Sequence, residues 1–161
     1  MNLSVSYVMK EINTYFYDKI IIKIMAKHNE IGKTGENIAV KYLKNKDFII
    51  LDRNFHIKGG EIDIIATKIE ECLHVKHQKL VFVEVKTKKV NENYNFKNDI
   101  FSPENNLTQS KRQKILKTIK HYLSFKKINE TDMDIKIMAI IVFLNEETKQ
   151  ARIKMYEEFI L

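Results

Sequence analysis

The 161-residue sequence contains little cysteine, proline or glycine, and no long hydrophobic run. Its single cysteine, Cys72, excludes a disulfide within the chain and fits a reducing compartment such as the cytoplasm. One proline and four glycines leave no flexible linker that would separate two domains. The apolar stretch Ile20-Ile21-Ile22 is too short for a membrane span or a signal-peptide core. We therefore expect no membrane association.

The chain does contain enough apolar side chains to form one core. Its residues are 44% hydrophobic, and its length of 161 residues corresponds to about one domain. Lysine and arginine outnumber the acids and give a net charge of +7. This charge favours a polyanionic partner such as nucleic acid, although many soluble proteins are equally basic without having one.

Residues 1–27 form an N-terminal extension with only a weak pattern. Residues 9–25 fit an irregular amphipathic helix lying on the body of the protein, but the extension could equally be disordered. Met25 could also be the functional start of the chain, in which case residues 1–24 do not belong to the mature protein. These alternatives stay open, and we place the folded domain at residues 28–161.

The rest of the sequence predicts two helices and five strands. The expected elements are a helix at 36–46 capped by Thr34, strands at 48–54, 61–67 and 79–87, a helix at 110–127, and strands at 134–144 and 151–156. The first three strands should form antiparallel hairpins, and the apolar run 134–144 is typical of a central strand buried on both faces. This order predicts an α/β fold with a central mixed sheet and helices on both sides.

Two segments between these elements are strongly polar. Residues 68–78 are predicted to form a hairpin tip, and residues 90–107 a long polar loop of the kind that is usually functional or disordered. The tip contains Cys72, His74 and His77, all of which can bind zinc. Their spacing is unfamiliar and no second cluster completes a tetrahedron, so a zinc site is disfavoured.

Acidic residues occur in two strands where charge should be energetically expensive. Strand alternation places Glu61 and Asp63 on one side of the second strand, and Glu84 and Lys86 on one side of the third. A buried carboxylate is costly unless it is paired or holds a cation. Asp63 and Glu84 on adjacent strands are therefore candidate ligands for Mg²⁺ or Mn²⁺. The simpler alternative is ordinary pairing of charges across the strands.

A metal ion at this position would favour phosphodiester hydrolysis. It would polarise a scissile phosphate and lower the pKa of a bound water, while Lys86 orients that water or offsets phosphate charge. Glu36, expected in the first helical turn, could reach the ion through a water molecule, or it could simply complement the helix dipole.

The predicted helix at 110–127 combines an apolar stripe with basic side chains. The residues expected to be buried are Ile115, Leu116, Ile119, Tyr122 and Leu123. Its candidate nucleic-acid-binding residues are Lys111, Arg112, Lys114 and Lys117. They could follow a phosphate backbone, or they could form an ordinary solvated face.

Several short motifs in the chain carry a family resemblance. They are Gly35-Glu36, Arg53-Asn54, Gly60-Glu61-Ile62-Asp63-Ile64-Ile65 and Phe82-Val83-Glu84-Val85-Lys86. These motifs resemble the YraN family, a bacterial group similar to Holliday-junction resolvases within the PD-(D/E)XK nuclease superfamily. The similarity covers roughly residues 28–161.

The resemblance implies a three-layer α/β/α restriction-endonuclease-like fold and a metal-dependent endonuclease acting on DNA, including branched or structured DNA. By motif, Asp63 corresponds to the first acid, Glu84 and Lys86 to the ExK half, and Glu36 to the helix acid. Ile62 replaces the proline of the superfamily name. The superfamily has inactive members, so a nucleic-acid-binding module of the same fold stays as the alternative, and a homodimer stays open.

Overall fold

The computed structural model describes residues 16–21, 31–72, 75–96 and 108–157. The elements in chain order are β1 (Phe16–Ile21), α1 (Ile31–Asn45), β2 (Ile49–Ile57), β3 (Gly60–Cys72), β4 (Val75–Lys89), α3 (Gln109–Lys126), the short 3-10 helix η3 (Glu130–Asp132), β5 (Asp134–Asn145) and β6 (Gln150–Tyr156). His74, most of the N-terminal extension and residues 97–107 of the predicted polar loop lie outside the described residues.

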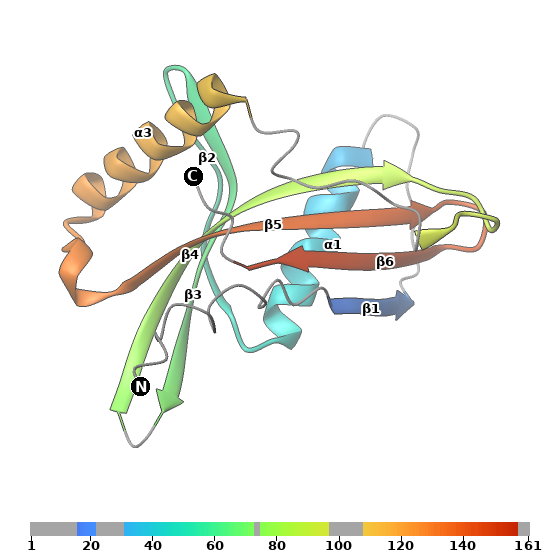
Figure 1. The fold of residues 1–161 in the computed structure, drawn as a ribbon, viewed down its shortest axis with the longest axis horizontal. Helices are drawn as coiled ribbons and strands as arrows, with labels where there is room; N and C mark the ends of the chain where they lie inside the picture. Colours follow the sequence, from blue (N-terminus) through green and yellow to red (C-terminus); the bar gives the residue numbers. More distant parts are fainter. Residues whose placement is uncertain (1–15, 22–30, 73–74, 97–107, 158–161) are drawn as a thin grey trace, which may run out of the picture.

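The strands form one six-stranded sheet in the order β1-β6-β5-β4-β3-β2 (Figure 1). β4 and β5 are parallel, while the other neighbouring strands are antiparallel, which confirms the mixed sheet and the hairpins β2–β3–β4. α1 packs on one face and α3 on the other. The fold is therefore the expected three-layer α/β/α restriction-endonuclease-like arrangement.

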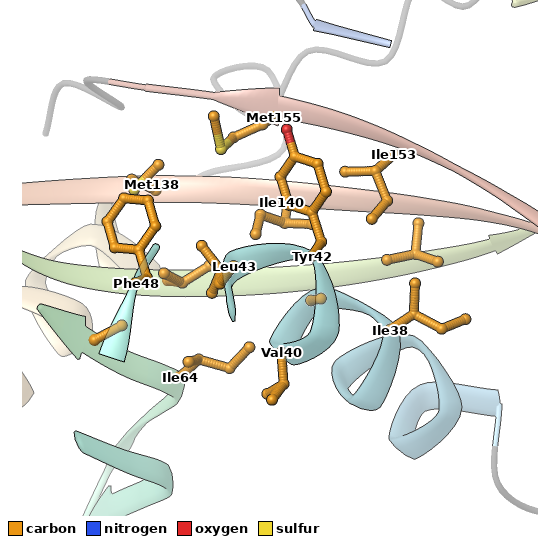
Figure 2. Close-up of a cluster of buried hydrophobic side chains, with 14 of the residues drawn as sticks. Ile38, Val40, Tyr42, Leu43, Phe48, Ile64, Met138, Ile140, Ile153 and Met155 are labelled. Atoms are coloured by element: carbon orange, nitrogen blue, oxygen red, sulfur yellow. The ribbon is translucent and has the colours of Figure 1, made fainter. Parts of the chain in front are cut away.

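The face under α1 is a continuous apolar core. Tyr42 and Leu43 of α1 pack with Ile64 of β3 and Ile140 of β5 in one buried cluster (Figure 2). The helix can approach the sheet closely at Gly35, where an added Cβ would lie only 3.0 Å from the Cβ of Thr87. This close approach brings the start of α1 next to Thr87, three residues after Glu84 on β4.

The opposite face is covered in two parts. Ile115, Ile119, Tyr122 and Leu123 of α3 pack with Ile65 and Phe82, and the Tyr122 ring stands edge-on to Phe82 at 5.7 Å. Leu116 is 40% exposed, so its predicted place in the buried stripe is wrong. Beyond α3, Tyr94 and Phe96 pack on Phe143, so the described start of the predicted polar loop is anchored to the sheet.

The helix predicted as one alternative for residues 9–25 is wrong at residues 16–21, which form the strand β1. This strand pairs antiparallel with β6, from Phe16 opposite Met155 to Ile21 opposite Gln150. The pairing partner is distant in the sequence, and a local periodicity cannot reveal it. None of the described helices is long and apolar enough to cross a membrane.

Two predicted boundaries also differ from the structure. α1 begins at Ile31, so Thr34 lies inside the helix and Glu36 is not in its first turn. The predicted polar tip belongs largely to β3 and β4, whose pairing continues to Cys72 opposite Val75 beyond the end of β2. Backbone pairing and the ion pair between Lys79 and Glu70, at 3.0 Å, accommodate these polar side chains.

Candidate metal and nucleic-acid site

Asp63 lies where β3 and β4 begin to separate. The described ladder between these strands starts at Ile64 opposite Val83. Just before it, Oδ2 of Asp63 accepts a hydrogen bond of 2.6 Å from the backbone N–H of Val85. The carboxylate thus bridges the two strands in place of a backbone acceptor, and a charge-assisted bond of this kind holds it firmly.

The side chains do not alternate regularly through Asp63. Ile62 packs with Ile65 on the α3 side, whereas Ile64 belongs to the core under α1. The predicted alternation, with Glu61 and Asp63 on one side of this strand, would put Ile62 and Ile64 together on the other side. It is therefore wrong at this point of β3. On β2, Asn54 lies between the partners of Ile62 and Ile64 and has a φ of 51°. This left-handed residue shows that the strand pair is irregular beside Asp63.

Burial raises the pKa of the Asp63 carboxyl from 3.8 to about 6. The Val85 N–H lowers this pKa, while the carboxylates of Glu84, Glu36 and Glu61 raise it further. The fold therefore brings acids from α1, β3 and β4 close enough to act on Asp63. An uncompensated negative charge at such a place is unfavourable, and a bound cation would relieve it.

Glu36 reaches this region together with a basic partner. Its Oε2 lies 3.7 Å from Nη2 of Arg53 on β2, and the same Nη2 donates a 2.8 Å hydrogen bond to Oδ1 of Asn37. Arg53 thus links β2 to α1 beside the acids. In the sequence, Arg53 stands out only as part of a family motif, and its pairing with Glu36 depends on packing that no local pattern predicts.

Glu84 and Lys86 have different surroundings although both follow Phe82 on the α3 side of β4. Glu84 is partly buried and its Oε1 forms an ion pair with Nζ of Lys111 on α3. Lys86 is exposed, and the described part of the chain contains no ion-pair partner for it. A lysine predicted to bind nucleic acid thus contacts a predicted metal ligand, and no local pattern in the sequence indicates this contact.

A cleft of about 590 Å³ opens beside Glu84, between the β2–β3 turn and the start of α3. Its charged or titratable lining residues are His56, Glu61, Glu84, Lys111 and Lys114. Gly60 allows the turn to press against α3, since a Cβ there would lie 2.9 Å from the carbonyl oxygen of Lys114. The cleft is thus built from both β-hairpin and helix.

The four basic residues of α3 that are predicted to bind nucleic acid differ in their position relative to the cleft. Lys111 and Lys114 line the cleft, whereas Lys117 is exposed outside its lining. Arg112 is partly buried, and its Nε has no hydrogen-bond partner among the described residues. Of these four residues, only Lys111 and Lys114 therefore lie in the same cleft as Glu61 and Glu84.

The donor chemistry fits a hard cation. Asp63 and Glu84 offer carboxylate oxygens, and Mg²⁺ is often held by one or two carboxylates while it keeps several waters. No group of three His, Cys, Asp or Glu side chains in the described residues is arranged to hold a metal ion in this conformation. Two protein carboxylates plus water is the set that these residues can provide.

Comparison with known families matches residues 35–155 to the uncharacterised protein family UPF0102. The chain belongs to this family. It is 43% identical over 114 residues to a UPF0102 protein of Campylobacter hominis, which covers 71% of this chain and 86% of the relative. A UPF0102 protein of Flavobacterium psychrophilum is 32% identical over 134 residues, covering 83% and 96%. The family resemblance found in the motifs is confirmed.

Proposed function

We propose that this UPF0102 protein is a metal-dependent endonuclease that acts on DNA. The observation that carries the proposal is the position of Asp63 and Glu84 at the separation of β3 and β4, beside a cleft with basic lining residues. A carboxyl group whose pKa is raised by burial and by neighbouring acids, as that of Asp63 is, is typical of functional sites. The restriction-endonuclease-like fold agrees with this activity.

In this proposal Asp63 and Glu84 hold Mg²⁺ or Mn²⁺, with Glu36 acting through water. When bound, the metal supplies a Lewis acid for the phosphate and lowers the pKa of a coordinated water. Lys86 lies on the same side of β4 as Glu84 and can offset charge on the scissile phosphate. Since Asp63 must be ionised to bind a cation, and its pKa is about 6, cleavage should increase as the pH rises through 6.

The basic residues of α3 give the proposed DNA surface. Lys111 and Lys114 would contact phosphates in the cleft, and Arg112 and Lys117 would extend this contact along the helix. Branched or structured DNA is the proposed substrate, and a homodimer would allow two strands to be cut. A cytoplasmic location, where bacterial DNA lies, belongs to the same proposal.

The test compares cleavage of supercoiled, single-stranded and four-way-junction DNA with Mg²⁺, Mn²⁺ or EDTA. Glu84→Gln and Lys86→Ala should each reduce metal-dependent nicking by about 100-fold or more, because each removes a group that stabilises transition-state charge. Lys41→Ala, which changes an exposed lysine of α1, is the matched control and should cut normally. Equal activity in all variants would indicate a contaminating nuclease and contradict the proposal.

Two observations favour a second function, a nucleic-acid-binding module without activity. Glu84 is paired with Lys111, and the described residues contain no ready-made metal cluster. Binding that weakens steeply with salt, together with absence of nicking under all metal conditions, would support this alternative. No binding to any nucleic acid at low salt would exclude both functions.

A further inference from the structure

The ion pair between Lys111 and Glu84 joins the two halves of the proposed site. Glu84 is one of the two carboxylates available to a metal, and Lys111 is one of the two lysines that line the cleft. One side chain of each proposed binding surface is therefore engaged with the other. A metal ion at Glu84 and the ammonium group of Lys111 would compete for the same carboxylate.

The surroundings of the pair make an exchange of partners feasible. The Lys111 side chain is 47% exposed and the Glu84 side chain 21% exposed. An ion pair this open to solvent contributes little to stability, because water screens the charges and the lysine loses conformational freedom. Lys111 can leave Glu84 without disturbing the core, since its four-carbon side chain extends from the exposed start of α3.

The cleft offers Lys111 an alternative partner when nucleic acid is present. Lys114 and His56 line the same cleft, and the first turn of α3 adds partial positive charge from its backbone N–H groups. A phosphate entering the cleft would meet these groups and Lys111 together. It would therefore compete with Glu84 for the lysine.

We infer that Lys111 is the resident counter-ion of Glu84, and that a nucleic-acid phosphate draws it away and so opens Glu84 to the metal. The inference rests on the proposed function and adds a coupling to it: nucleic acid and metal each strengthen the binding of the other. Such coupling is reciprocal, so it can be measured from either ligand. Metal binding without nucleic acid is correspondingly weakened by Lys111.

The experiment measures Mn²⁺ affinity of the full chain by calorimetry without DNA, and the affinity for a fluorescent four-way junction with Ca²⁺ or EDTA at constant ionic strength. Lys111→Met should bind Mn²⁺ about two- to fivefold more tightly than the wild type, which is the effect expected from losing a half-exposed ion pair. Its junction affinity should fall, and the gain produced by Ca²⁺ should shrink. Thermal melting checks that the variant is folded.

Lys114→Met is the matched control, because it removes a cleft lysine that forms no ion pair with the acids in the described structure. It should weaken junction binding while leaving both Mn²⁺ affinity and the Ca²⁺ gain unchanged. Glu84→Gln identifies the Mn²⁺ binding that belongs to this site.

The outcomes separate the two levels of the proposal. Glu84-dependent Mn²⁺ binding that is the same in the wild type and Lys111→Met would overturn the counter-ion role alone. Absence of Glu84-dependent binding in both proteins would overturn the metal site of the proposed function and this inference with it.

Discussion

The two helices cover the same sheet, but in different ways. On the α1 side, Ala39 and Leu43 have no exposed surface and pack into one continuous core. On the α3 side, the helix buries a narrower stripe, Tyr94 and Phe96 cover a separate region, and the cleft opens at the start of the helix. One face therefore stabilises the sheet, while the other leaves part of it available to a ligand.

This difference explains where the fold can accommodate unfavourable charge. Glu84 lines the cleft on the α3 side, and Asp63 lies next to it where the pairing of β3 and β4 stops. Similar carboxylates under α1 would be enclosed by aliphatic side chains without compensation. The comparison between the two faces can be tested by substitutions on each side.

The largest expected effect is on the α1 face. Leu43→Ala should lower the free energy of unfolding by about 2–5 kcal/mol, because it leaves a cavity in a fully buried position. Leu116→Ala on α3 is the matched control and should change it by less than about 0.5 kcal/mol, since Leu116 is 40% exposed. Urea denaturation measures both. Equal losses would contradict the difference between the faces.

Gly60→Ala tests the contact between the β2–β3 turn and α3. The added methyl group would clash with Thr118 and the Lys114 carbonyl, so a loss of about 1–3 kcal/mol is expected. Gly32→Ala in α1 meets no atom within 4 Å and should instead gain up to about 1 kcal/mol from helix propensity. A neutral Gly60→Ala variant would mean that the wall of the cleft is loosely packed.

Asp63→Asn tests the cost of the site itself. Folding raises the Asp63 pKa from 3.8 to about 6, so the protonated carboxyl group is favoured in the folded state. Its contribution to the free energy of unfolding is complete below pH 3.8 and is lost as the pH rises through 6. Asp63→Asn should therefore stabilise the protein at pH 8 by about 1–2 kcal/mol after allowance for solvent screening. The gain should vanish below pH 4 in urea denaturation series. Asp134→Asn, at an exposed carboxylate, is the control, and a gain independent of pH would refute the explanation.

The smallest effect concerns the start of α3. Thr108 caps this helix, with its Oγ1 accepting a 3.2 Å hydrogen bond from the Lys111 N–H. Thr108→Ala should cost about 1 kcal/mol in urea denaturation, and Thr108→Ser should restore most of it. If both substitutions were equally harmful, the methyl group rather than the cap would be responsible.

The local patterns of the sequence predict most of the fold. The apolar run of β5 is buried along most of its length as predicted, and the stripe of α3 is correct except at Leu116. These predictions succeed because periodicity reports which side of an element is buried. The same reasoning fails at Asp63, where an irregular strand pair changes the side on which Ile62 lies.

The remaining errors arise from contacts between distant segments. β1 is stabilised as a strand by its pairing with β6, which is distant in the sequence. Most of the polar residues 68–78 are strand residues because β3 and β4 pair there. The proximity of Asp63 and Glu84 follows from strand order and could be anticipated. The pairing of Glu84 with Lys111 could not, because it depends on how α3 packs on the sheet.

The parallel pairing of β4 with β5 has a consequence for how the chain folds. The strands β2, β3 and β4 form successive hairpins, and β5 and β6 form another, so each can pair across a short turn. β4 and β5 require a crossover through residues 90–133, and closing that long loop is entropically slower. During synthesis the first hairpins can therefore pair early. Asp63 and Glu84 can meet before the helix that carries Lys111 has left the ribosome.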